Sequence, residues 1–222
     1  MSDAVTKRFV DLSHTVEHGM ITYPGLPAPT VSDFLSRQES RAHYSPDTEF
    51  HIGRIEMVAN TGTYLDTPFH RYPEGRDLSE LPLEAMADLE GVVIRVLRSE
   101  RAIGTEPFNG LDLCGKAVLV ETGWSAHWAT ERYLSGHPYL TEGAALRLVA
   151  ARAALVGIDS LNIDDTNDGR RPVHSLLLRA GIPIVEHMTG LSLLPARGFR
   201  FFAVPVKVKG LGSFPVRAFA QI

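Results

Sequence analysis

Short apolar segments bounded by Gly, Pro or Asp recur along the chain, and they are the feature that most constrains its fold. They are rich in Val, Ile and Phe and have the length of strands, and none approaches the roughly 18 apolar residues of a membrane-spanning helix. This pattern predicts a protein built largely on β-structure. The segments predicted as strands are 50–57, 91–97, 116–121, 154–158, 182–186 and 201–208.

Two segments carry helical signals instead. Thr141 is a suitable N-cap for a helix over 142–153, and a shorter helix is predicted over 173–179, between Pro172 and Gly181. The order strand, helix, strand in this half resembles a βαβ unit, so we expect an α/β fold with a mixed sheet. With no internal repeat or evident linker, the best interpretation is one domain over 1–222.

Composition narrows the functional class. The net charge of −4 comes from 22 basic and 26 acidic residues without a basic stripe, which argues against nucleic-acid binding. Residues 1–10 lack the apolar region of a secretory signal, and the single cysteine, Cys114, cannot form an internal disulfide. We therefore expect a soluble cytoplasmic protein with no membrane or nucleic-acid partner. The polar segment 36–48, which contains Pro46, is predicted to be a loop that could cover a site.

The densest group of polar side chains lies between Asn60 and His70. Asn60, Tyr64, Asp66 and His70 are all even-numbered, so an extended chain would point them to one side, and Pro68 argues against a continuous helix. A carboxylate and an imidazole on one side of the chain suit metal binding or acid–base catalysis. The alternative is that Asp66 caps a turn and His70 lies at the surface.

His174 and Glu186 form a second candidate pair. His174 belongs to the predicted short helix, and Glu186 ends the apolar strand that follows it. A carboxylate at the end of an apolar strand needs water, a partner or a metal ion, and strand ends are where α/β sheets open their ligand sites. His174 alone could equally be a capping or surface histidine.

The sequence of this region resembles the cyclase family of metal-dependent hydrolases, which includes bacterial kynurenine formamidases and isatin hydrolases. The central motif of that family reads His-x-Gly-Thr-His-x-Asp-x-Pro-x-His, and residues 60–70 follow it with two changes. The positions that match are Gly62, Thr63, Asp66, Pro68 and His70. Further ordered matches are 11–14, Gly19, 23–25, 122–124, 156–159, 205–207, 215–217 and the spacing of His174 to Glu186.

The resemblance implies a swivelling β/β/α fold, a homodimer or homotetramer, and an active site near the strand ends. It also implies a divalent metal, zinc or manganese, bound to side chains of the two clusters. Carried over by position, Asp66, His174 and Glu186 are metal ligands and His70 is the acid–base residue.

Two positions depart from the family motif. Asn60 and Tyr64 stand where the family has ligand histidines, and an amide or a phenol is a poorer zinc ligand than imidazole. We therefore expect one metal ion per chain, with Tyr64 donating a hydrogen bond to the oxyanion of the reaction. The alternative is a metal-free relative that acts as a lyase or isomerase or only binds a small ligand.

The predicted function is hydrolysis of a small cyclic or formyl amide, or of a lactone, by metal-activated water with His70 as acid and base. Asn60, Tyr23, Trp124 and Arg171 are candidate substrate-binding residues, and Arg171 or its neighbour Arg170 could clamp a substrate carboxylate. Whether His51 replaces a lost ligand stays open, since a bulge could turn it toward the cluster.

Overall fold

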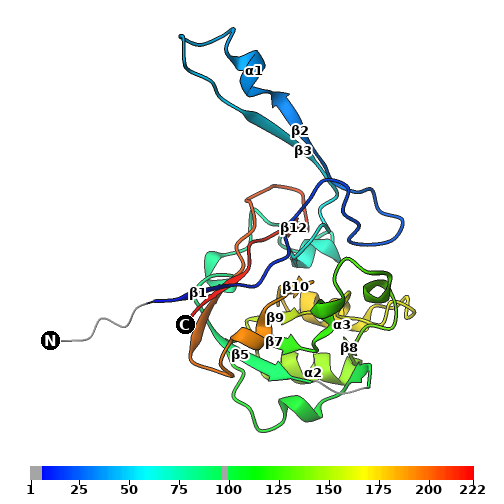
Figure 1. The fold of residues 1–222 in the computed structure, drawn as a ribbon. Helices are drawn as coiled ribbons and strands as arrows, with labels where there is room; N and C mark the ends of the chain where they lie inside the picture. The colour runs from blue at the N-terminus through cyan, green and yellow to red at the C-terminus, as the bar shows by residue number, and fades with distance from the viewer. Residues whose placement is uncertain (1–6, 97–99) are drawn as a thin grey trace, which may run out of the picture.

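The computed structural model describes residues 7–96 and 100–222. Two segments with sequence predictions extend beyond these ranges. They are 1–10, which is predicted to lack a secretory signal, and 91–97, a predicted strand whose last residue is Leu97. Within the described ranges the chain forms a nine-stranded mixed sheet with few helices (Figure 1). Its strands, in spatial order, are β1 (Phe9–Asp11), β13 (Phe219–Gln221), β11 (Phe199–Phe202), β5 (Leu89–Arg95), β7 (Ala117–Glu121), β9 (Leu155–Ile158), β10 (Ile184–Glu186), β4 (Tyr64–Asp66) and β12 (Ser213–Pro215).

The middle of the sheet is parallel and its two sides are antiparallel. Strands β5, β7, β9 and β10 run parallel to one another, whereas β11 pairs antiparallel with β5 and β4 pairs antiparallel with β10. The residues of β7 and β9 are all buried, as expected for strands covered on both faces. The predicted α/β fold with a mixed sheet is confirmed.

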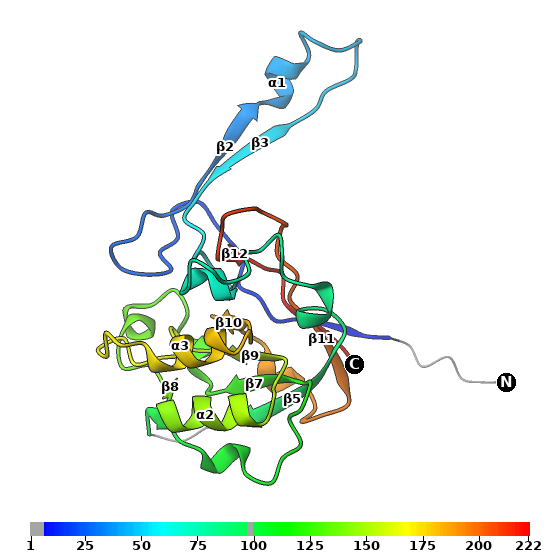
Figure 2. The same cartoon turned by 180° about the vertical axis from the view of Figure 1, so that it is seen from behind.

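Two helices cover one face of these parallel strands (Figure 2). Helix α2 (Glu142–Ala150) begins after Thr141, whose side chain accepts a hydrogen bond from the Ala144 N–H at 3.3 Å. Helix α3 (Pro172–Arg179) follows Arg171. A second apolar cluster, which includes Leu65, Phe199 and Phe201, packs together without any residue of these helices. Helix α3 lies on the strands that carry the candidate site.

A long hairpin projects from this body (Figures 1 and 2). It consists of β2 (Thr30–Leu35), the short helix α1 (Arg37–Ser40) and β3 (Ile52–Glu56), with β2 and β3 antiparallel. Segment 36–48, expected to be a loop over the site, instead forms α1 and the hairpin tip far from the body, so that expectation is wrong for this chain. Every residue of β3 is exposed, so the predicted strand 50–57 exists but is not part of the main sheet.

Two predicted elements end earlier in the structure than the sequence indicates, and several short elements remain. The predicted strand 201–208 is wrong in its second half, because β11 ends at Phe202 and the chain then leaves the sheet before Pro205. Helix α2 ends before Arg152, whose φ of 55° is left-handed. The remaining elements are β6 (Ala102–Ile103), β8 (Tyr139–Leu140) and the 3-10 turns η1 (Pro68–His70), η2 (Leu83–Ala85), η3 (Glu106–Phe108), η4 (Trp124–His127), η5 (Glu131–Leu134) and η6 (Leu191–Leu193). Among the described residues, no helix has the length and apolarity that crossing a membrane requires.

Candidate active site

Strand pairing and one helix gather the two candidate clusters at one place. Strand β4 pairs with β10 so that Tyr64 lies opposite Glu186 and Asp66 lies opposite Ile184. Turn η1 follows β4 directly and ends at His70, and α3 contributes His174 from its first turn. Residues that are more than 100 positions apart in the sequence thereby face one another.

Three of these side chains lie close enough together to hold one metal ion. One ligand atom each of Asp66, His70 and His174 lies within 4.8 Å of the other two. His174 Nε2 lies 3.6 Å from Asp66 Oδ2, which is buried and accepts no hydrogen bond. A buried carboxylate oxygen that accepts no hydrogen bond is costly unless a cation lies beside it, either the charged His174 imidazole or a bound metal ion. The donor set of one carboxylate and two imidazoles fits a divalent metal such as zinc or manganese.

Glu186, the third predicted ligand, is engaged elsewhere. Its Oε1 accepts the Ile163 N–H at 2.6 Å and its Oε2 accepts the Tyr64 hydroxyl at 2.5 Å. Oε1 also lies 3.6 Å from His174 Nε2. Among the described residues, Glu186 is not part of the group whose ligand atoms all lie within 4.8 Å of one another. Its role as a ligand therefore stays a prediction, with His70 as the competing third ligand.

Tyr64 and Tyr23 are held as neutral phenols. Burial and the charge of Glu186 raise the pKa of Tyr64 well above its usual range, and the same two causes raise the pKa of Tyr23. The Tyr23 hydroxyl donates to the Leu161 carbonyl at 2.6 Å and accepts from the Asn162 amide at 3.0 Å. In this structure the Tyr64 hydroxyl is therefore a hydrogen-bond donor to Glu186.

Asp164 orients His174, and the sequence reasoning missed it. Its Oδ1 accepts the Val173 N–H at 2.7 Å, and its Oδ2 accepts the N–H of His174 at 3.0 Å and Nδ1 of the same residue at 2.7 Å. With Nδ1 held in this way, Nε2 faces Asp66. Burial opposes a charge on His174, but Glu186, Asp164 and Asp66 together outweigh it and raise the pKa of the imidazole to about 10.

Two residues at the start of β12 complete the surroundings of His70. The Ser213 hydroxyl donates to Asp66 Oδ1 and lies 2.9 Å from His70 Nδ1. Gly212 approaches the His70 backbone so closely that a Cβ at this position would collide with it. No local pattern marks either residue in the sequence, whereas Asp164 stands among acidic residues after β9, a place where ligand sites open.

A cavity of about 260 Å³ opens onto these groups. Among the predicted residues, Tyr23, Asn60 and Arg171 line it, together with the catalytic candidates. Its lining comprises Tyr23, Leu26, Asn60, Tyr64, His70, Arg71, Asn162, Arg171, His174 and Glu186. Trp124 is not part of it, because its indole turns away and donates to the Tyr133 carbonyl at 3.0 Å. His51 is also remote: it pairs with Asp33 on the projecting hairpin at 2.8 Å, so it does not replace a ligand.

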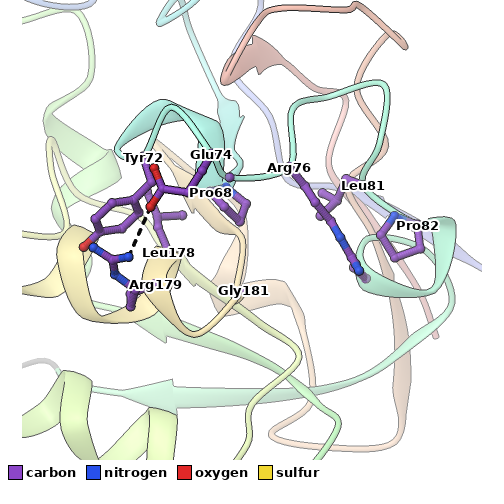
Figure 3. Close-up of a pocket in the computed structure, with 11 residues that line it drawn as sticks. Pro68, Tyr72, Glu74, Arg76, Leu81, Pro82, Leu178, Arg179 and Gly181 are labelled. Atoms are coloured by element: carbon purple, nitrogen blue, oxygen red, sulfur yellow. Dashed lines mark hydrogen bonds and ion pairs between the residues drawn. The ribbon is translucent and has the colours of Figure 1, made fainter.

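A separate cavity of about 320 Å³ lies on the other side of η1 (Figure 3). Pro68, Leu81 and Leu178 give it an apolar lining, and Arg179 stacks over Tyr72 there. It contains none of the candidate metal-binding or catalytic side chains.

Comparisons with known proteins identify the family to which the chain is similar. The model of the Cyclase family matches residues 10–165. Kynurenine formamidase of Bacillus cereus is 25% identical over 214 residues, covering 96% of this chain and 97% of the relative. The kynurenine formamidase of Geobacillus thermodenitrificans is 26% identical over 212 residues and covers 95% of each chain.

Solved structures share the fold. Isatin hydrolase A from Labrenzia aggregata superposes with a TM-score of 0.83 at 22% identity, covering 97% of this chain and 94% of that one. A second isatin hydrolase, bound to the product analogue thioisatinate, gives 0.81 at 19% identity, with 97% and 92% covered. The relatives are hydrolases of amide bonds outside peptides, which supports the predicted hydrolase and does not favour the lyase or binding-protein alternative. The match of the family model over residues 10–165 shows that this chain belongs to the Cyclase family.

Proposed function

We propose that the protein is a metal-dependent hydrolase that opens the amide bond of a small N-formyl or cyclic amide. The observation that carries the proposal is the buried Oδ2 of Asp66, which accepts no hydrogen bond and lies 3.6 Å from Nε2 of His174, a residue that lines the cavity of about 260 Å³. The kynurenine formamidase and isatin hydrolase relatives support the amide as the bond that is cleaved.

Asp66 and His174 would hold one zinc or manganese ion per chain, with His70 or Glu186 as the third protein ligand. A metal bound there supplies Lewis-acid polarisation of the substrate carbonyl and lowers the pKa of a water molecule from about 15.7 toward about 7. Asp164 keeps His174 oriented for this task, as the carboxylate partners of ligand histidines do.

His70 is proposed to move the proton from the attacking water to the leaving nitrogen. Its side chain is 36% exposed and lines the cavity, and Ser213 lies at hydrogen-bond distance from its Nδ1, which fixes the ring. The neutral Tyr64 hydroxyl, now donating to Glu186, is the nearby donor that a developing oxyanion could recruit.

Hydrolysis assays with N-formylkynurenine, N-formylaniline and isatin test this proposal. The parent protein should hydrolyse at least one of them, and Asp66→Asn and His174→Ala should lose both metal and activity. His70→Ala separates the two roles of that residue: retained metal with lost activity supports proton transfer, whereas lost metal supports ligation. Activity that survives in Asp66→Asn and His174→Ala would contradict the proposal.

The projecting hairpin supports a homo-oligomer, with a second copy of the chain as the proposed partner. A two-stranded hairpin is marginal in water, yet this one exposes several large apolar side chains to solvent. They are Val31, Phe34, Tyr44, Phe50, Ile52 and Ile55. Light scattering should give the mass of a dimer or tetramer, and Phe34→Asp with Ile55→Asp should lower it; a monomeric parent would contradict the proposal.

We also propose a cytoplasmic location, since the single cysteine, Cys114, is exposed and free, a state that a reducing compartment preserves.

A further inference from the structure

We propose that Arg71 and Arg171 together bind a carboxylate of the substrate, so that the preferred amide is an anionic one. This inference rests on the proposed function and names the class of amide that the site selects. Both guanidinium groups belong to residues that line the catalytic cavity.

Arg71 is fixed next to the proposed proton-transfer residue. It follows His70 directly at the end of η1, and its Nε donates to the Ser175 hydroxyl of α3 at 3.3 Å. Its Cζ also lies 5.4 Å from the centroid of the Tyr72 ring, and among the described residues its two terminal nitrogens donate no hydrogen bond. Among the residues that the structure describes, no carboxylate lies within ion-pair distance of Arg71.

Arg171 stands immediately before α3, which carries His174. Its Nη1 meets only neutral acceptors, the Asn162 amide oxygen at 3.5 Å and the Asp165 carbonyl at 3.3 Å. Within the described part of the chain, it too has no carboxylate within ion-pair distance. Its backbone is left-handed, with φ 49° and ψ 60°, a conformation that is unfavourable for a non-glycine residue.

Arg170, the residue before Arg171, is paired with a carboxylate instead. The guanidinium of Arg170 forms two bonds with Asp168, from Nε at 3.0 Å and from Nη2 at 2.7 Å. Arg170 is exposed and does not line the cavity. Of the two adjacent arginines, the one at the cavity is therefore the one that forms no ion pair among the described residues.

The charge balance of the cavity favours an anionic ligand. Its one lining carboxylate, Glu186, is completely buried and accepts hydrogen bonds from Tyr64 and Ile163. The two arginines therefore carry the uncompensated charge of the lining. Guanidinium groups bind carboxylates through paired N–H donors, and a carboxylate held by residues adjacent to the reacting groups would fix the amide at a constant distance from them.

The test compares two aryl formamides that differ in one carboxylate: N-formylanthranilate and N-formylaniline. The parent should prefer N-formylanthranilate. Arg171→Gln and Arg71→Gln should each raise KM for this substrate on the order of 10-fold to 100-fold, with kcat, metal content and N-formylaniline hydrolysis little changed. Arg170→Gln is the matched control and should behave as the parent.

Equal hydrolysis of both formamides by the parent, or equal losses on both in the arginine variants, would overturn the inference while leaving the proposed hydrolase intact. If the parent hydrolyses neither formamide, the proposed function fails, and calorimetric binding of N-formylanthranilate then tests the inference. The inference requires that the parent binds N-formylanthranilate and that binding weakens in Arg171→Gln but not in Arg170→Gln. Should Arg171→Gln not fold, Arg71→Gln and Arg171→Lys give the same reading, because a lysine keeps the charge but not the paired donors.

Discussion

Replacing Asp164 with Asn should weaken metal binding without touching a metal ligand. Asp164 is completely buried, and its two oxygens accept the N–H groups of Val173 and His174 and the His174 ring N–H. An amide keeps one oxygen and turns an NH2 toward one of these donors, so a buried N–H loses its partner. That loss should lower the free energy of unfolding by about 1 to 3 kcal/mol.

The effect on metal affinity follows from the same contacts. Partners that orient ligand histidines are typically worth about 10-fold to 100-fold in metal affinity, or about 1.4 to 2.7 kcal/mol. Urea unfolding in a chelator measures the first effect, and competition with a chromophoric chelator measures the second. Asp165→Asn is the control, because this neighbour is only partly buried and its ion pair with Arg101 spans 3.8 Å. A folded Asp164→Asn protein that binds metal as tightly as the parent would refute the reasoning.

Three further outcomes are expected. Tyr64→Phe removes the hydrogen-bond donor to Glu186 and should lower the free energy of unfolding, measured with urea, by about 1 to 3 kcal/mol. Its metal content, measured by elemental analysis, should not change; lost metal would show that Tyr64 is a metal ligand. Ser213→Ala should lower kcat by about 10-fold or more because His70 loses its partner, and an unchanged kcat would contradict that assignment. Burial lowers the pKa of His187 to about 3. Its contribution to stability should therefore be complete above the unfolded pKa near 6.5 and fall as the pH drops toward 3, by about 2 kcal/mol at pH 5. Urea unfolding of His187→Asn at several pH values should show a weaker dependence of stability on pH, and an unchanged dependence would contradict this prediction.

The sheet could be predicted where its strands are covered on both faces. The strands β7 and β9 consist of buried apolar residues, so their sequences read as short apolar runs between turns. The projecting hairpin could not be placed, because β3 carries the same residue types with every position exposed. Apolar composition does not tell whether a strand is covered by its own chain.

The candidate site could also be predicted only in part. The even spacing of Tyr64 and Asp66 along one extended segment was visible in the sequence, and the structure places both in β4. The partners that set their roles come from distant segments: Ser213 reaches Asp66 through the pairing of β12 with β4, and Glu186 faces Tyr64 through that of β10 with β4. Such pairings follow from the register of the whole sheet and leave no local signature.

The measurement that tests the central claim most directly is the metal content of the purified chain, followed through chelation and reloading. The account predicts about one zinc or manganese ion per chain, lost together with amide hydrolysis on chelation, restored with it on reloading, and absent from Asp66→Asn. Amide hydrolysis that persists in fully metal-free protein would contradict the account, as would a full metal content in Asp66→Asn.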